Sequence, residues 1–170
     1  MLKPAILVVM DATLKLSGRL EPRESWEARS CSVEAALGVV HNRTAFLVLR
    51  ELFYGAERFE QIVERTGFSE ATVAARLREL TDDELLERSA YQEPGQRTRQ
   101  KYALTPKGTD FFPILASLMS WGDRWANDRA VVELRHRDCG ARVEVELRCA
   151  DGHAVEADAL ELAVRGTPRA

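Results

Sequence analysis

The sequence of 170 residues has few cysteines, no long apolar run and no excess of basic charge. Three cysteines are an odd number and do not suggest the disulfide framework of a secreted protein, so a reducing, cytoplasmic location is expected. No segment approaches the roughly 18 consecutive apolar residues of a membrane span. The formal net charge of −3 counts against non-specific binding of nucleic acid. A local basic patch can still contact phosphates.

The sequence also lacks the patterns typical of an active site. It has no glycine-rich phosphate loop, no paired-carboxylate signature and no convincing base partner for a cysteine nucleophile, so we expect neither an enzyme nor a required cofactor. No internal repeat or low-complexity tract is evident. The content of 45% hydrophobic and 30% charged residues is typical of a globular protein.

The segment from Arg58 to Leu104 predicts a helix-turn-helix followed by a wing. Apolar residues recur at helical spacing in 58–66, Gly67 interrupts that helix, and Ser69 begins a second one. The second helix has Val73, Leu77 and Leu80 on its core face. An apolar strand over 85–88, a loop over 92–96 and a return strand over 101–104 then predict a hairpin. The predicted fold is mainly α with a small β-hairpin wing, and this arrangement typically binds DNA.

The residues expected to contact DNA come from the second helix and the hairpin. A helix fits the major groove, where its N-terminal half reaches base edges. The hairpin tip is cationic, and no acidic residue occurs between Arg97 and Lys107. A wing arginine can enter the minor groove or contact the backbone. The candidate contacts are Ser69, Thr72, Ala75, Arg76, Arg97, Arg99 and Lys101.

The flanking regions predict four parts: an extension and linker over 1–29, the DNA-binding and dimerisation domain over 30–129, a small β appendage over 130–155 and a tail over 156–170. Helices are expected at 32–40 and from Asn42 or Arg43 to Gly55. After Thr105 and Pro106, one long helix is predicted to reach Trp125. Its apolar surface exceeds what a small core can cover, which predicts a homodimer, although the extension could instead cover it. Alternating residues over 142–148 predict a half-buried strand, and the tail is either a short helix or frayed.

Several blocks, in order, resemble the HxlR-type winged helix-turn-helix transcription regulators. They are Cys31–Leu37, Leu49–Gly55, Arg58–Ile62, Arg76–Leu80, Tyr102–Gly108 and the pair Trp121-Gly122. The resemblance implies a homodimer that binds a palindromic operator in double-stranded DNA, more often a repressor than an activator. One departure is His41–Thr44, where the family usually has a Gly-Lys-Trp-type turn. The alternative function is a winged-helix interaction module that does not bind DNA.

Two further features concern thiols. Cys31 occupies a position where relatives can carry a thiol sensor of quinones, aldehydes or oxidants, and a helix N-terminus favours the reactive thiolate. The alternative is that Cys31 is a small buried hydrophobe. In the appendage, His136, Cys139, Cys149 and His153 give ligand types and spacings that a structural zinc ion accepts. Gly152 lies where the second turn of a zinc ribbon would be expected to have another cysteine. The alternative is therefore a hairpin with surface histidines and no metal. The effector is expected to be a small molecule or a redox or electrophile signal.

Overall fold

The computed structural model describes residues 14–21, 31–92, 95 and 97–164. Most of the extension and linker over 1–29 and part of the wing tip therefore lie outside the described residues. The chain divides into two compact units. The helical unit is Ser30–Val145, and the terminal unit combines 1–29 with 146–170. This division passes through the segment 130–155, which the sequence treats as one appendage. Within the described residues, no helix is long and apolar enough to cross a membrane.

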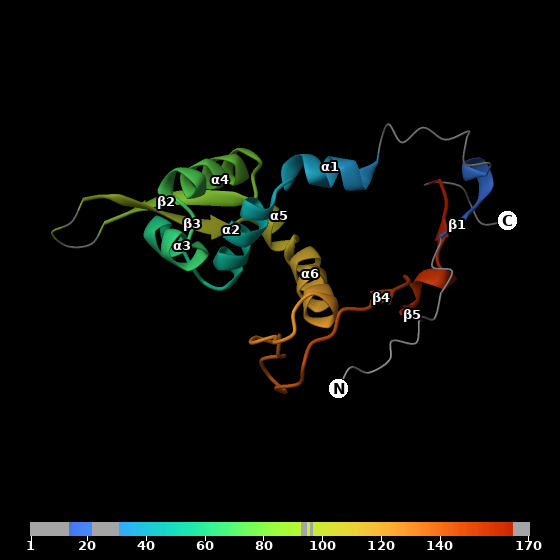
Figure 1. Cartoon of the computed structure of the whole chain (residues 1–170). Helices are drawn as coiled ribbons and strands as arrows, with labels where there is room; N and C mark the ends of the chain where they lie inside the picture. Colours follow the sequence, from blue (N-terminus) through green and yellow to red (C-terminus); the bar gives the residue numbers. More distant parts are fainter. Residues whose placement is uncertain (1–13, 22–30, 93–94, 96, 165–170) are drawn as a thin grey trace. The chain divides into compact units, whose positions relative to one another are not determined.

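The helical unit has the order expected of a winged helix-turn-helix (Figure 1). Asn42 and Ser69 accept backbone N–H groups at the starts of the second and fourth helices, as their N-cap chemistry predicts. Gly67 ends the third helix with a φ of +69°, which opens the tight turn between the two helices of the motif. The elements are α1 (Ser32–Val39), α2 (Arg43–Phe53), α3 (Phe59–Thr66), α4 (Glu70–Asp82), β2 (Leu86–Tyr91), β3 (Arg99–Leu104), α5 (Pro106–Thr109) and α6 (Phe112–Trp125).

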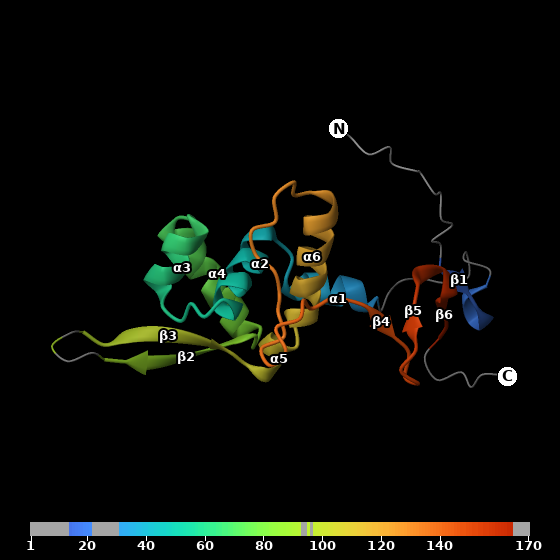
Figure 2. The same ribbon diagram turned by 90° about the horizontal axis from the view of Figure 1, so that it is seen from below.

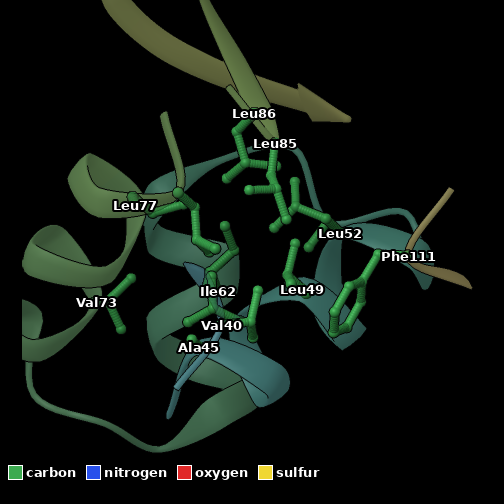
Figure 3. Packing of buried hydrophobic residues seen from close by; sticks show 13 residues of the cluster. Val40, Ala45, Leu49, Leu52, Ile62, Val73, Leu77, Leu85, Leu86 and Phe111 are labelled. Atoms are coloured by element: carbon green, nitrogen blue, oxygen red, sulfur yellow. The ribbon is translucent and has the colours of Figure 1, made fainter. Parts of the chain in front are cut away.

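The core of the helical unit forms where α2, α3 and α4 meet the base of the hairpin (Figure 3). Val48 and Leu49 of α2 are completely buried, in agreement with the predicted central position of this helix. The three apolar residues predicted for the core face of α4 are also buried. Burial of these side chains fixes which face of α4 stays outside. The core residues are Val40, Ala45, Val48, Leu49, Leu52, Ala56, Ile62, Val73, Leu77, Leu80, Leu85, Leu86 and Phe111.

The wing is an antiparallel pair in which Leu86 lies opposite Leu104 and Tyr91 lies opposite Arg99. Both strands are longer than predicted. The chain just before α3 adds a short third element to this sheet, because the Tyr102 N–H donates to the Glu57 carbonyl at 2.8 Å. In Figures 1 and 2 the hairpin extends away from the helices. Its base is therefore held between the core and the start of α3.

The single helix predicted after Thr105 is wrong, because the structure divides it into α5 and α6. Pro113 lies in the first turn of α6 and has no N–H to continue the hydrogen bonds of α5. The break turns Phe111 into the core, where its ring centroid lies 5.3 Å from that of Phe46. After α6 the chain turns back beside this helix (Figure 2).

The terminal unit joins the two ends of the chain. β1 (Lys15–Leu16) pairs in parallel with β6 (Glu161–Leu162), and β4 (Leu147–Arg148) pairs antiparallel with β5 (Ala154–Val155). Two short 3-10 helices are η1 (Gly18–Leu20) and η3 (Ala157–Ala159). The tail is thus neither a helix nor frayed at 161–162, because backbone pairing with the extension orders it. Of the half-buried strand predicted over 142–148, only Leu147–Arg148 forms a strand, and both residues are exposed. Val143 and Val145 are each 43% exposed and lie outside the strands.

Candidate nucleic-acid interface

The start of α4 is organised by two hydroxyl groups. The Ser69 Oγ accepts the Thr72 N–H at 3.2 Å and lies 2.9 Å from the Thr72 Oγ1. Ser69 is exposed and Thr72 is half-buried. The capping bond fixes both side chains at the N-terminal end of the helix. Both hydroxyls can still accept or donate a further bond there, so a phosphate or a base edge is within their chemical reach.

The outer face of α4 carries Arg76, whose side chain is held in place by an ion pair. The Nη2 of Arg76 contacts the Glu79 Oε1 at 2.5 Å, three residues further along the helix. The Arg76 side chain is 19% exposed, so the guanidinium lies close to the helix surface. Ala75 beside it is half-buried, whereas Arg78 is exposed. Both arginines of α4 are therefore accessible on its surface, although only Arg76 was predicted to contact DNA.

The described part of the wing carries its cations at the tip and along β3. Arg97, Arg99 and Lys101 are exposed. Directly opposite residues of a hairpin share a face, so Arg99 and Lys101 lie on the face that also carries Tyr91. The Arg99 Nη1 lies 3.8 Å from the Oε1 of Glu60 in the first turn of α3. An exposed pair at this distance is weak and can exchange for a phosphate.

The structure changes which basic residues belong to this surface. Lys107 lies on α5 rather than on the wing, and its Nζ donates to the Asp83 carbonyl at 2.6 Å, so it holds the end of α4. Two other arginines, which sequence reasoning missed, lie close to the motif. The Arg58 guanidinium is 5.0 Å from the Tyr91 ring, and that of Arg43 is 5.8 Å from the Phe68 ring, just before α4. Neither arginine stood out in the sequence, because each lies outside the α4 helix and the hairpin tip from which the contacts were chosen.

A second set of exposed side chains is apolar and lies on α1 and on α6. Val33 and Leu37 of α1 are 67% and 53% exposed, and Trp121 and Trp125 of α6 are 62% and 70% exposed. No described residue of α1 is buried. A groove of 290 Å³ lies between α2 and α6, and Met119 and Leu134 contribute to its apolar lining. Exposed apolar side chains of this size are typical of an interaction surface.

The predicted sensor and metal ligands are all exposed or half-buried. Cys31 is the half-buried N-cap residue of α1, and its thiol makes no capping hydrogen bond. His136 and Cys139 belong to the helical unit, where the His136 Nδ1 lies 3.2 Å from the Cys139 Sγ. Cys149 and His153 belong to the terminal unit. Among the described residues, no three His, Cys, Asp or Glu side chains gather to hold a metal ion. Zinc binding therefore stays a prediction.

Known proteins resemble the chain over this region. The family described as HxlR-like helix-turn-helix matches residues 39–130. Over 120 residues the chain is 36% identical to the HTH-type transcriptional regulator Rv3095 of Mycobacterium tuberculosis, covering 69% of this chain and 75% of that protein. Over 94 residues it is 30% identical to the HTH-type transcriptional regulator YodB of Bacillus subtilis, covering 55% and 82%.

A solved structure supports the same comparison. PA1607, described as a proposed transcription factor, is 32% identical and superposes with a TM-score of 0.66, covering 76% of this chain and 91% of that chain. A second, PA1374 from Pseudomonas aeruginosa, is 28% identical with a TM-score of 0.53, covering 74% and 86%. The matched part of the chain contains both helices of the motif, the wing and α6.

Proposed function

The chain belongs to the HxlR-like helix-turn-helix family, and on this premise we propose that it is a homodimeric repressor that binds a palindromic operator. DNA-binding regulation of transcription is the activity of this family. The proposal adds the dimer, the sign of regulation and the residues that contact DNA. It also adds a signal, either a small molecule or an oxidant or electrophile, that releases the operator.

The observation that carries the proposal is the outer face of α4 together with the cationic wing at its side. Burial of Val73, Leu77 and Leu80 leaves Ser69 and Arg76 on surfaces that can enter a major groove. An arginine there can bind the O6 and N7 of guanine together. Arg97 and Arg99 would then lie over the backbone or the adjacent minor groove.

The proposed dimer uses the apolar surface of α1 and α6. Covering the two tryptophans and the exposed leucines would remove a large apolar area from water, which is the main driving force of association. A twofold axis also brings two copies of α4 to two half-sites one helical turn apart. A palindromic operator follows from this symmetry.

Fluorescence anisotropy with the upstream DNA of the gene, across a series of salt concentrations, tests the function directly. We expect specific binding, and the logarithm of the association constant should fall linearly with the logarithm of the salt concentration. A scrambled duplex of equal length is the control. Equal affinity for both duplexes would contradict sequence-specific regulation, and no binding at low salt would favour the interaction module that the sequence left open.

For a thiol signal, we propose Cys31 as the sensor because its Sγ lies at the start of α1, within the proposed dimer region, and is not fully buried. Modification there would disturb the dimer and so the spacing of the two α4 helices. Cys31→Ser should retain operator affinity and lose release by diamide or a quinone, whereas Cys139→Ser is the matched control and should still be released. Release that persists in Cys31→Ser would overturn this assignment.

For a small-molecule signal, the groove between α2 and α6 is the proposed site, because it is apolar and borders the same dimer helix. Its volume of 290 Å³ suits a small ligand. Met119→Trp should fill the groove. An effector that raises the melting temperature of the native chain should then have no effect on the variant, and an equal shift in both would place the effector elsewhere.

A further inference from the structure

The groove between α2 and α6 contains a charged side chain whose sign predicts the class of ligand that the groove binds. All the described residues that line the groove belong to the helical unit. Among them only Arg50, in the last turn of α2, carries a charge, and the others are apolar or aromatic. A cation in an otherwise apolar groove favours an anion with an apolar body, because such a ligand gains both a charge-assisted hydrogen bond and burial.

The helical spacing of α2 places Arg50 between two aromatic residues of the groove. Phe46 precedes it by about one turn and Tyr54 follows it by about one turn, so all three lie on the same side of the helix. The ring centroid of Phe53 lies 5.1 Å from that of Phe112 at the start of α6. This contact holds the two helices together, and the position of Arg50 relative to the groove is therefore fixed.

Arg50 retains hydrogen-bond donors for an anion although it already forms an ion pair. Its Nε and Nη2 both donate to the Oε1 of Glu51, at 2.9 and 2.5 Å. None of the described residues accepts a hydrogen bond from its Nη1, and a guanidinium has five N–H donors in all. The Arg50 side chain is 33% exposed and that of Glu51 is 6% exposed. Buried Glu51 therefore holds the guanidinium in place and leaves part of it accessible.

The remaining walls of the groove favour an aromatic ligand. Phe46 and Phe112 contribute rings from the two sides of the groove, and Met119 contributes a thioether, which packs favourably against an aromatic ring. The Tyr54 hydroxyl donates to the Met119 Sδ at 3.9 Å. Sulfur is a weak acceptor, so this hydroxyl can turn to a stronger acceptor on a ligand. The volume of 290 Å³ suits one small ring system.

The chain after α6 closes the groove on a third side (Figure 2). Val132 and Leu134 contribute apolar side chains there. The Val143 N–H donates to the Leu134 carbonyl at 2.8 Å, which fixes this segment where it passes the groove. A site that is enclosed by three segments of chain can bury most of the surface of a small ligand.

We propose that the groove binds a small aromatic carboxylate, with the carboxylate on Arg50 and the ring between Phe46, Phe112 and Met119. The inference rests on the proposed function, because this ligand is the small-molecule signal proposed above. It also shows how the signal acts. α2 packs against α4, whereas α6 carries part of the proposed dimer surface. A ring inserted between α2 and α6 therefore changes the spacing of the two α4 helices and releases the operator.

Isothermal titration calorimetry with 1-naphthoate, on the full chain without DNA, tests the site separately from DNA binding. 1-Naphthamide has the same rings without the charge, and octanoate has the charge without a ring. We expect 1-naphthoate to bind at least about tenfold more tightly than the amide, because a hydrogen bond to a charged group contributes about that factor or more. It should also bind more tightly than octanoate. No detectable binding of 1-naphthoate, or equal affinity for either control compound, would overturn the inference.

Variants of the ion pair identify the residue that holds the carboxylate. Changing both Arg50 and Glu51 to Gln removes the cation without leaving a buried carboxylate unpaired. The affinity for 1-naphthoate should then fall about ten- to hundredfold, and that for 1-naphthamide should not change. Glu51→Gln alone keeps Arg50 and should retain binding. Arg65→Gln is the matched control, because Arg65 is exposed on α3 and does not line the groove. Unchanged affinity of the double variant for 1-naphthoate would overturn the assignment.

A third variant tests the groove without altering the ion pair. Met119→Trp should abolish binding of 1-naphthoate and of 1-naphthamide, and retained binding of 1-naphthoate would place the ligand elsewhere and overturn the inference. Fluorescence anisotropy of an operator complex then separates the site from the proposed function. We expect 1-naphthoate to release the operator from the native chain and not from the double variant. Binding through Arg50 without release would confirm the site and reject its role as the signal.

Discussion

Gly108 illustrates a position where the packing leaves no room for a side chain. The α4–β2 turn, in which Glu84 has a φ of +60°, is held by Thr105, whose Oγ1 donates to the Glu84 carbonyl at 2.6 Å. The same oxygen accepts the Gly108 N–H at 3.0 Å. This arrangement brings the α5 backbone so close to the start of β2 that a Cβ on Gly108 would lie 2.1 Å from the Leu85 carbonyl oxygen.

Gly108→Ala should therefore destabilise the helical unit, because the backbone of α5 or of Leu85 must move. Overpacking of this kind costs about 1–3 kcal/mol of the free energy of unfolding, which urea denaturation measures. Gly38→Ala is the matched control, since nothing lies within 4 Å of the added Cβ and the site is helical. The control should be neutral or stabilising. Equal stability of both variants would show that α5 is not held against Leu85 in this way.

Arg76 is the residue at which base recognition is expected to be most sensitive. Arg76→Ala should weaken operator binding by about 1–3 kcal/mol and relax the preference at one base pair. Its pair with Glu79 on the helix surface contributes little to stability, so the melting temperature should stay nearly constant. Binding is measured against single-base operator variants. Arg129→Ala removes the same charge outside α4 and is the control. A uniform loss over all base pairs would make Arg76 a phosphate contact.

At the scale of elements, the wing separates phosphate binding from sequence recognition. Changing both Arg97 and Arg99 to Ala should weaken binding to the specific duplex and to the scrambled duplex by the same factor. It should also reduce the slope of log affinity against log salt by roughly 0.9 for each lost phosphate contact. The control is a variant in which Arg135 and Arg137 are changed to Ala, because it loses the same two positive charges outside the wing. An unchanged salt slope in the wing variant would exclude wing contacts to the backbone.

Element boundaries followed from local chemistry where a cap or a glycine defined them. Asn42, Ser69 and Thr105 cap helices as predicted, and Gly67 ends α3. The break between α5 and α6 was missed because the apolar spacing continues across it while Pro113 interrupts the hydrogen bonds. The alternating residues near Val143 misled for another reason: alternation predicts burial only if another surface covers one face.

At the scale of the whole molecule, the expected assembly is a dimer through α1 and α6. Light scattering should give twice the chain mass of 19.1 kDa. Leu118→Glu with Trp121→Glu should give a monomer with weakened operator binding, because charges would be buried in the interface. Val131→Glu is the control, as Val131 is 89% exposed and belongs to neither helix. A native chain that is monomeric at micromolar concentration would rule out the dimer.

The sequence alone determined the helix-turn-helix, the wing and the face of α4 that stays outside, because caps, glycines and apolar periodicity are local properties of the chain. Only the tertiary structure decided the approach of Arg99 to Glu60, the removal of Lys107 from the basic surface, and the pairing of residues 15–16 with 161–162. These depend on residues far apart in the chain, whose approach is set by how the core packs.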